Sequence, residues 1–349
     1  MLMRKIVKLL LCFLMLAVFT GNAIGETAEG TEAAIPVNVL ILPKFEISEM
    51  AGDFPGEAQY YYERYLDGAE TYEIAGGTEG NLLYVKDGVA LYMLGMGKVN
   101  SALNTMAVLS DRRFDFSDAY ILSTGCAGSS AGNTVMGDVF IITAAVDYDL
   151  GHHADIREMT QEKDVTWFHD SDFDSGAYVL LDPELTDKVW ALAENVPVET
   201  TPVTREYMRA AFDGEEWAVR DPKVIRGTSV TADNYWKGEY GHANALEMVR
   251  EYGCPDPYVA TEMEDVAVCL AVKRMGMLDR LIIVRDSVNM DVFLLGATPE
   301  VLWGEGISEK ERAEDEGSNV ETADIFATAM KNNFAVGSVI IDAILAGDF

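Results

Sequence analysis

The chain has 349 residues, of which 49% are hydrophobic and 24% are charged, a composition that excludes global disorder. Its 58 acidic and 26 basic residues give a net charge of −32. A protein that binds nucleic acid polymers needs a basic face against the phosphates, and the sequence contains no basic patch. The charge therefore argues against nucleic acid polymers and against docking on an anionic membrane.

Residues 1–25 have the pattern of a secretory signal peptide. Arg4, Lys5 and Lys8 precede an unbroken apolar run over 9–19, and small and polar residues follow. An N-terminal membrane anchor is the alternative, but the run is shorter than the roughly 20 residues of a span. Cleavage after this segment predicts an exported protein, periplasmic or secreted, whose net charge falls from −32 to −35 because three basic residues are lost. No later segment predicts a membrane span in the mature chain.

Apolar runs of strand length alternate with helical patterns through the rest of the chain. Residues 26–36 are small and acidic, which predicts a flexible leader. The expected strands are 37–42, 82–85, 89–94, 119–123, 139–145, 224–230 and 281–284, and the expected helices are 101–109, 180–194, 261–275, 321–331 and 336–345. Such alternation predicts an α/β fold with a mostly parallel sheet.

Two features refine this organisation. Asp87-Gly88 lies between two apolar runs and is a hairpin signal, so the sheet is expected to be mixed. Length alone suggests two domains at about 150 residues each. No linker occurs, however, and a polar, irregular stretch predicts an insertion near 151–223 within a single domain over 37–349.

The cysteines and histidines do not indicate a metal site. Cys12 would leave with the signal peptide, so Cys126, Cys254 and Cys269 remain. An odd number leaves at least one thiol unpaired within the chain. Two alternatives remain: a Cys254–Cys269 disulfide, or three free thiols. No Cys or His spacing matches a metal motif. The adjacent His152 and His153 are expected to have a surface or packing role.

Two glycine-rich segments lie where strands end. Residues 95–102 (GMGKVNSA) lead into an expected helix, and 123–128 (STGCAG) follow an expected strand. Glycines there allow a close approach of the backbone to an anion or a hydroxyl, and open α/β sheets bind ligands at these strand ends. Asp138, just before the next strand, is expected to bond turn amides.

Three further segments carry polar or aromatic groups suited to a ligand. Residues 231–236 (TADNYW) place two aromatic rings beyond a strand, which can stack on a flat ring or simply pack. Residues 261–265 (TEMED) are expected to open a helix, where acids favour the dipole and a carboxylate can also accept from two sugar hydroxyls. Residues 284–291 (VRDSVNMD) follow a strand; Arg285 can hold an anion, and Asn289 can both donate and accept hydrogen bonds.

The order and separation of these motifs resemble the purine nucleoside phosphorylase and methylthioadenosine nucleosidase superfamily. The segment 43–63 (PKFEISEMAGDFPGEAQYYYE) and the Asn-X-Asp ending at 289–291 are similar, more specifically, to the purine nucleoside permease family. The resemblance covers about 37–290. It implies a three-layer, nucleoside phosphorylase-like α/β domain.

The resemblance also implies roles for individual residues. Met263 and Glu264 would contact the ribose, Tyr235 would stack on the purine beside Trp236, and Cys126, Ala127 and Gly128 would form the floor. Phosphate or the attacking water would be held by Gly97, Lys98 and Arg285. A water-activating glutamate would come from the first strand–helix turn, as Glu49 or Glu46.

For adenine-type nucleosidases, the resemblance implies an aspartate at position 289, which protonates the base. Asn289 departs from that pattern. An amide forms hydrogen bonds but transfers no proton. The resemblance implies an asparagine here in the 6-oxopurine phosphorylases, so Asn289 favours inosine- or guanosine-like substrates or weak catalysis, unless Asp286 or Asp291 compensates. Catalysis would then depend on Asn289, Arg285 and Glu49.

Together with the signal-peptide pattern, the resemblance implies a protein that binds purine nucleosides and cleaves their N-glycosidic bond outside the cytoplasm, by phosphorolysis or hydrolysis. No metal or organic cofactor is expected, and phosphate is a candidate co-substrate. The alternatives are a non-catalytic nucleoside-binding or transport-associated protein and an inactive, storage-type relative. The resemblance further implies a homo-oligomer.

Overall fold

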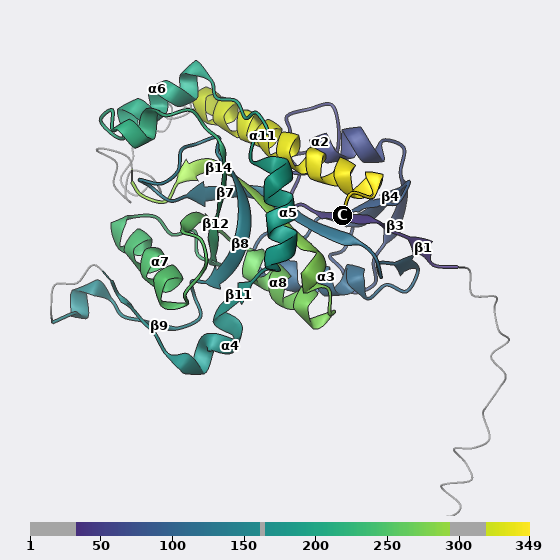
Figure 1. Cartoon of the computed structure of the whole chain (residues 1–349), viewed down its shortest axis with the longest axis horizontal. Helices are drawn as coiled ribbons and strands as arrows, with labels where there is room; N and C mark the ends of the chain where they lie inside the picture. Colours follow the sequence, from purple (N-terminus) through teal and green to yellow (C-terminus); the bar gives the residue numbers. More distant parts are fainter. Residues whose placement is uncertain (1–32, 161–164, 294–318) are drawn as a thin grey trace, which may run out of the picture. The chain divides into compact units, whose positions relative to one another are not determined.

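The computed structural model describes residues 33–160, 165–293 and 319–349 (Figure 1). Pro36–Phe349 cluster as one compact unit. The expected signal peptide over 1–25 lies outside the described residues, as does most of the expected leader.

Ten strands form one mixed sheet among the described residues. Nine of them follow the order β11-β8-β12-β13-β7-β2-β5-β4-β3, and β14 pairs with both β7 and β8. Their bounds are β2 (Val39–Leu42), β3 (Glu70–Glu73), β4 (Leu82–Lys86), β5 (Val89–Leu91), β7 (Tyr120–Ser129), β8 (Val139–Asp147), β11 (Tyr178–Leu180), β12 (Val224–Thr231), β13 (Tyr258–Glu262) and β14 (Leu281–Met290). Four two-residue strands are β1 (Ile35–Pro36), β6 (Phe114–Asp115), β9 (His152–His153) and β10 (Trp167–Phe168).

Helices cover the sheet and fill the connections between strands (Figure 1). They are α2 (Gln59–Tyr61), α3 (Lys98–Leu109), α4 (Asp174–Ala177), α5 (Pro183–Ala193), α6 (Pro202–Ala211), α7 (Glu239–Glu251), α8 (Asp265–Arg274) and α11 (Asn319–Ala346). A π-helical turn (Tyr62–Leu66) extends α2, and short 3₁₀ turns occur at Ile156–Glu158, Ser171–Phe173, Glu216–Val219 and Leu278–Arg280.

The strand pairings confirm the predicted α/β class with a mixed sheet. Parallel ladders join β2 to β5 and β7, β12 to β8 and β13, and β14 to β7. Antiparallel ladders join β14 to β8 and β13 to β7, so that β8, β12, β13, β7 and β14 close a ring. The predicted hairpin forms between β4 and β5, with Asp87 and Gly88 both at positive φ, as a tight hairpin turn requires.

Two strands are longer than the sequence predicted. β7 continues through 123–128 and β14 through 285–290, segments expected to be turns. The two extensions pair with each other, Arg285 opposite Gly125 and Asp286 opposite Cys126, so backbone hydrogen bonding overrides the turn propensity of the glycines. As a result, small and charged residues line a strand pair inside the molecule.

The C-terminal segment forms one helix, α11, where two were predicted. The polar residues between the two expected helices do not break it, because both asparagines are used: Asn332 donates to the carbonyls of Gly137 and Glu199, and Asn333 donates to Asp286. By length and composition alone, the stretch Ala323–Ala346 of the described chain would be able to cross a membrane. It is 61% buried within the protein and packs on β14, β7 and α5, as a core helix does.

The structure bears on the roles predicted for Asp138, the three cysteines and the adjacent histidines. Asp138 is buried, accepts from the amides of Val135 and Lys223 and pairs with Arg220, which confirms its role in the turn. Cys126, Cys254 and Cys269 are all free, so the Cys254–Cys269 disulfide does not form. His152 and His153 are exposed, and no group of three or more metal-ligating side chains occurs among the described residues.

Candidate active site

A cavity opens just after β2, at the C-terminal parts of β7 and β13, and beside β14. It is lined by Lys44, Phe45, Glu57, Met96, Cys126, Ala127, Gly128, Tyr235, Thr261, Glu262, Met263, Glu264, Val288 and Asn289. A smaller adjoining pocket shares several of these residues and adds Asn234 and Trp236. The motifs that lie far apart in the sequence therefore meet around one space.

Most of the predicted site residues lie at this cavity. Seven of them line it: Cys126, Ala127, Gly128, Tyr235, Met263, Glu264 and Asn289. Trp236 lines the adjoining pocket. Gly97 and Arg285 contact Glu264 from behind and are not lining residues. Lys98 and Glu49 line neither space.

The carboxylate that the β2–α2 segment supplies to the cavity belongs to Glu57, which the sequence did not single out. Glu57 is buried, and its two oxygens accept from the backbone amides of Lys44 (2.7 Å) and Cys126 (2.8 Å). Glu49, by contrast, is exposed. Glu46 accepts from the amides of Ala58 and Gln59 and orders the loop. The irregular loop carries no periodic signal that would distinguish its glutamates.

Gly125 provides the space that Glu57 occupies. A Cβ atom added at Gly125 would lie 2.5 Å from Glu57 Oε1 and 2.6 Å from Oε2. At these distances the Cβ and the carboxylate cannot both keep their positions. We expect Gly125→Ala to displace the carboxylate and to lower the rate of any reaction that Glu57 assists by about 100-fold, the effect of a displacement of ~1 Å. Steady-state kinetics measure this effect.

Gly80→Ala is the matched control, because Gly80 also has a positive φ (+77°) but a Cβ there would meet no atom within 4 Å. Both variants should keep the circular dichroism spectrum of the wild type. Equal rates for Gly125→Ala and wild type would contradict the placement of Glu57.

Lys44 lies under the cavity floor, where its side chain is almost fully buried. Its Nζ donates to the carbonyl oxygens of Leu42 (3.0 Å) and Thr124 (3.0 Å) and to Ser123 Oγ (2.7 Å). Burial, followed by repulsion from Arg285, lowers the pKa of Lys44 to about 8. The ammonium is therefore protonated at neutral pH, with its three N–H groups already satisfied.

Glu264 belongs to a buried charge cluster around Arg285. Its Oε1 accepts from the Gly97 amide (3.1 Å) and its Oε2 from Arg285 Nη2 (3.1 Å). The same guanidinium donates to Asp265 Oδ1 (2.6 Å) and Glu262 Oε2 (3.2 Å). Three carboxylates surround one cation, so the cluster carries excess negative charge where the resemblance implied a phosphate contact.

Glu262 links this cluster to the start of α8. It ends β13, and its Oε2 accepts from the amides of Glu264 (2.6 Å) and Asp265 (2.7 Å), the orphan donors of the first helical turn. Burial, followed by repulsion from Asp265, raises the pKa of Glu262 to about 7. The predicted helix over 261–275 therefore begins at Asp265, because Thr261 and Glu262 continue the sheet.

Tyr235 and Asn289 lie at the other end of the cavity. The Tyr235 ring is 55% exposed and free to cover a planar group. Trp236 instead stacks on Tyr148, with ring centroids 4.9 Å apart, and so supports the wall. The Asn289 amide faces Gly128, where an added Cβ would lie 2.7 Å from Asn289 Oδ1. One aromatic face and one amide thus define a site for a polar ring.

Lys98 is held away from the cavity by acidic neighbours. Its Nζ lies 2.8 Å from Asp147 and 2.9 Å from Asp149. The hydrogen bonds to these carboxylates raise its pKa against the opposing effect of burial. Lys98 therefore does not offer a free charge to phosphate in this structure.

The two aspartates considered as substitutes for an acid at Asn289 are engaged elsewhere. Asp291 accepts from Tyr258 (2.8 Å) and contacts His242 Nδ1 (2.7 Å). Asp286 accepts from Asn333 (2.7 Å), and burial raises its pKa well above the usual value. Neither is a lining residue, so Asn289 is the group that would contact the ring.

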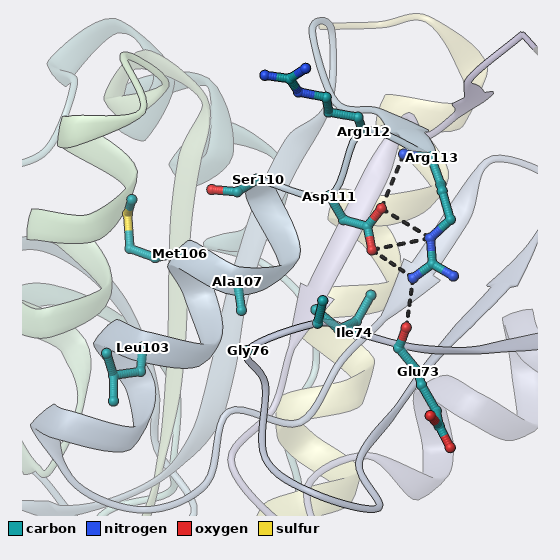
Figure 2. A pocket seen from close by; sticks show the side chains of 11 residues that line it. Glu73, Ile74, Gly76, Leu103, Met106, Ala107, Ser110, Asp111, Arg112 and Arg113 are labelled. Carbon is teal, nitrogen blue, oxygen red and sulfur yellow. Dashed lines mark hydrogen bonds and ion pairs between the residues drawn. The ribbon is translucent and has the colours of Figure 1, made fainter. Parts of the chain in front are cut away.

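A second, wider depression lies beside α3, on the surface around Ile74, Gly76 and Leu103 (Figure 2). Within it, Arg113 forms hydrogen bonds with Asp111 and with the Glu73 carbonyl. It is an open groove without a buried charged group. The chemistry of the molecule therefore concentrates in the cavity around Glu57 and Glu264.

Two curated proteins are similar to this chain in sequence. A "probable purine nucleoside permease" of Schizosaccharomyces pombe is 25% identical over 222 residues, 56% of this chain and 63% of the relative. A 5'-methylthioadenosine/S-adenosylhomocysteine nucleosidase of Maridesulfovibrio salexigens is 30% identical over 115 residues, 33% of this chain and 45% of the relative. The chain thus spans less than two thirds of the length of either relative.

Solved structures show the fold. The 5'-methylthioadenosine/S-adenosylhomocysteine nucleosidase of Neisseria meningitidis superposes with a TM-score of 0.52 at 17% identity, over 88% of this chain and 99% of that one. The Streptococcus pneumoniae enzyme superposes with a TM-score of 0.51 at 15% identity, over 88% and 100%. These similarities confirm the predicted nucleoside phosphorylase-like fold. The family model described as purine nucleoside permease (NUP) matches residues 36–348, and the chain therefore belongs to the purine nucleoside permease family.

Proposed function

We propose that this protein binds purine nucleosides and cleaves their N-glycosidic bond by hydrolysis. The observation that carries the proposal is the single cavity that brings together an aromatic face (Tyr235), an amide (Asn289), and two buried carboxylates (Glu57 and Glu264). The nucleosidase names of the structural neighbours and the family description support it.

In this proposal the ends of the cavity bind the two parts of a nucleoside. The purine stacks on Tyr235, and the Asn289 amide donates to a ring nitrogen as negative charge moves into the leaving base. Glu264 accepts from the 2′- and 3′-hydroxyls of the ribose, since a carboxylate only accepts hydrogen bonds. Glu57, which lines the same cavity, accepts a proton from the attacking water.

The charges around the cavity favour water over phosphate as the nucleophile. Arg285 is surrounded by three carboxylates, and Lys98 is bound by two. The Lys44 ammonium already donates its three N–H groups to oxygens of the protein. A phosphate dianion would therefore be repelled by the carboxylates, and none of these three residues offers a free cation to offset the repulsion. A neutral water molecule is not repelled in this way.

The direct test is incubation of the purified protein with inosine, guanosine and adenosine, with and without phosphate, followed by chromatography of the released base. We expect base release without phosphate. Release only with phosphate would make the protein a phosphorylase. Binding detected by calorimetry without release would favour the non-catalytic reading, which the amide at Asn289 supports because it transfers no proton.

Glu264→Gln is expected to lower kcat/KM by about 10- to 100-fold, mainly through KM. The loss corresponds to replacing charge-assisted hydrogen bonds with neutral ones, at about 1.5–3 kcal/mol. Glu184→Gln, at an exposed position of α5, is the control. Turnover unchanged by Glu264→Gln would show that the ribose binds elsewhere.

Export and self-association also belong to this proposal. The signal pattern over 1–25 supports a role outside the cytoplasm, in nucleoside uptake or salvage; the protein should appear in the periplasm or medium, cleaved near residue 25. The exposed apolar side chains of Met96, just before α3, and of Val99 and Leu103 on α3 support a homo-oligomer. A monomeric mass by light scattering would refute the assembly.

A further inference from the structure

We propose that Glu46 is a positioning residue, whose carboxylate fixes the backbone around Glu57 and so keeps the Glu57 carboxylate at the cavity. The consequence for catalysis rests on the proposed function, whereas the hold of Glu46 on the chain around Glu57 does not. The resemblance implied Glu46 only as an alternative water-activating glutamate. Its hydrogen bonds indicate a different role.

Three backbone amides that flank Glu57 in the sequence donate to the Glu46 carboxylate. Oε1 accepts from Gly56, and Oε2 accepts from Ala58 (2.9 Å) and Gln59 (2.6 Å). One side chain therefore holds the backbone both before and after Glu57. Ala58 and Gln59 also begin α2, so Glu46 satisfies two amides that have no acceptor within that helix.

The segment that carries Glu57 depends on such side-chain acceptors. Residues 43–58 contain no helix or strand, and the Glu57 amide makes only a long hydrogen bond to the Phe45 carbonyl (3.3 Å). The Glu57 carboxylate reaches the two backbone amides that bind it from one position of its own backbone. Glu46, anchored just after β2, supplies the contacts that fix this position.

The hold requires a carboxylate at Glu46. Each of its oxygens accepts from two amides, Oε1 from Ile47 and Gly56 and Oε2 from Ala58 and Gln59. Burial raises the pKa of Glu46, and these four hydrogen bonds oppose the rise. An ionised carboxylate only accepts hydrogen bonds, whereas the amide nitrogen of a glutamine would set N–H groups against two N–H donors. Glu46→Gln should therefore release one side of the contact.

Gly56 gives a second way to break the same contact. A Cβ there would lie 2.5 Å from Glu46 Oε1 and 2.9 Å from Glu46 Cα, so Gly56→Ala displaces the carboxylate without changing its charge. Gly176→Ala is the matched control, because a Cβ there makes an ordinary 3.4 Å contact with Leu150. Neither glycine has a positive φ, so alanine is compatible with the backbone at both positions.

The first test is a double-mutant cycle in kcat for the nucleoside that the wild type cleaves. Glu46→Gln should lower kcat by about 100-fold with little change in KM, the effect of misplacing Glu57 by ~1 Å. In the Glu57→Gln background, the same substitution should lower kcat by less than about twofold, because Glu46 acts through Glu57. Glu184→Gln, exposed on α5, should have no effect in either background. Equal losses in the two backgrounds, or an unchanged kcat, would overturn the proposal.

The second test does not depend on activity, because the Cys126 thiol reports the position of Glu57. Cys126 lines the same cavity, and burial, followed by repulsion from Glu57, raises the pKa of its thiol well above the usual value. Loss of that repulsion should speed alkylation by iodoacetamide by about tenfold, the change in thiolate fraction for one pKa unit. Mass spectrometry of peptides separates Cys126 from Cys254 and Cys269.

We expect faster alkylation of Cys126 in Glu46→Gln and in Glu57→Gln, with no further increase in the double variant. An unchanged rate in Glu46→Gln would overturn the inference on Glu46. A wild type that releases no base overturns the proposed function alone, since the alkylation experiment needs no turnover.

The third test covers a Glu46→Gln variant that does not fold. Gly56→Ala should then show the lower kcat and the faster alkylation of Cys126, while Gly176→Ala behaves as the wild type. Wild-type behaviour of Gly56→Ala would overturn the proposal. Unfolding of both Glu46→Gln and Gly56→Ala would mean that Glu46 serves the stability of the whole fold, and would overturn it as well.

Discussion

Glu57→Gln is expected to reduce nucleoside cleavage by about 10²- to 10⁴-fold, the usual contribution of a general base. The amide keeps the size of the side chain, and its one oxygen can still accept from one of the two backbone amides, of Lys44 and Cys126, that Glu57 binds. Because Glu57 is not assigned to the substrate's ring or hydroxyls, substrate binding should change little. The loss should therefore appear in kcat rather than in KM. Steady-state kinetics with base release as the readout measure both.

Glu49→Gln separates the two carboxylates of the same segment. Glu49 is exposed and its side chain lines neither pocket, so this variant should keep wild-type kinetics. A loss of activity in Glu49→Gln together with an active Glu57→Gln would return the role to Glu49. That outcome would also require the loop to rearrange when substrate binds.

Arg285→Met is expected to destabilise the fold by about 3–5 kcal/mol, the cost of leaving buried charges without their partner. Arg285 is fully buried and lies 2.6–3.2 Å from carboxylate oxygens of Asp265, Glu264 and Glu262. Arg113→Met is the control, since its ion pair with Asp111 is at the surface and worth about 0–1 kcal/mol. Urea unfolding at pH 7 measures the difference.

The deficit of Arg285→Met should depend on pH in a defined direction. The pKa of Glu262 is raised to about 7, so between about pH 4.5 and 7 the folded state binds more protons than the unfolded state does. The stability from this group therefore falls as pH rises through that window. Removing Arg285 raises the pKa of Glu262 further, because the carboxylate loses a neighbouring cation. The loss in the free energy of unfolding should therefore be smaller at pH 5, where the carboxyl groups are more protonated, than at pH 8. A deficit independent of pH would contradict the charge cluster.

Local sequence signals were sufficient for the regular elements. The hairpin at Asp87-Gly88 forms because that pair adopts the positive φ angles of a tight turn. The start of α5 is equally local: Asp182 accepts from the amide of Leu185 and precedes the proline at the first helical position. Such predictions succeed because the physical cause lies within a few residues along the chain.

Elements whose ends depend on distant partners were predicted less well. β7 and β14 extend through glycine and asparagine because each supplies backbone partners to the other. α11 continues through Asn332 and Asn333 because Gly137, Glu199 and Asp286 accept from their amides. These contacts join residues that lie tens to hundreds of positions apart in the chain. A sequence pattern that spans only neighbouring residues cannot reveal them.

By itself, the sequence determined the α/β class, the acidic charge, and the motifs that supply Tyr235, Glu264 and Asn289. Only the tertiary structure decided which charges face the cavity. It brought Glu57 rather than Glu49 to the site, enclosed Arg285 among carboxylates and tied Lys98 to aspartates. The reason is physical: burial and the nearest counter-charge set the chemistry of an ionisable group, and both are properties of three-dimensional packing.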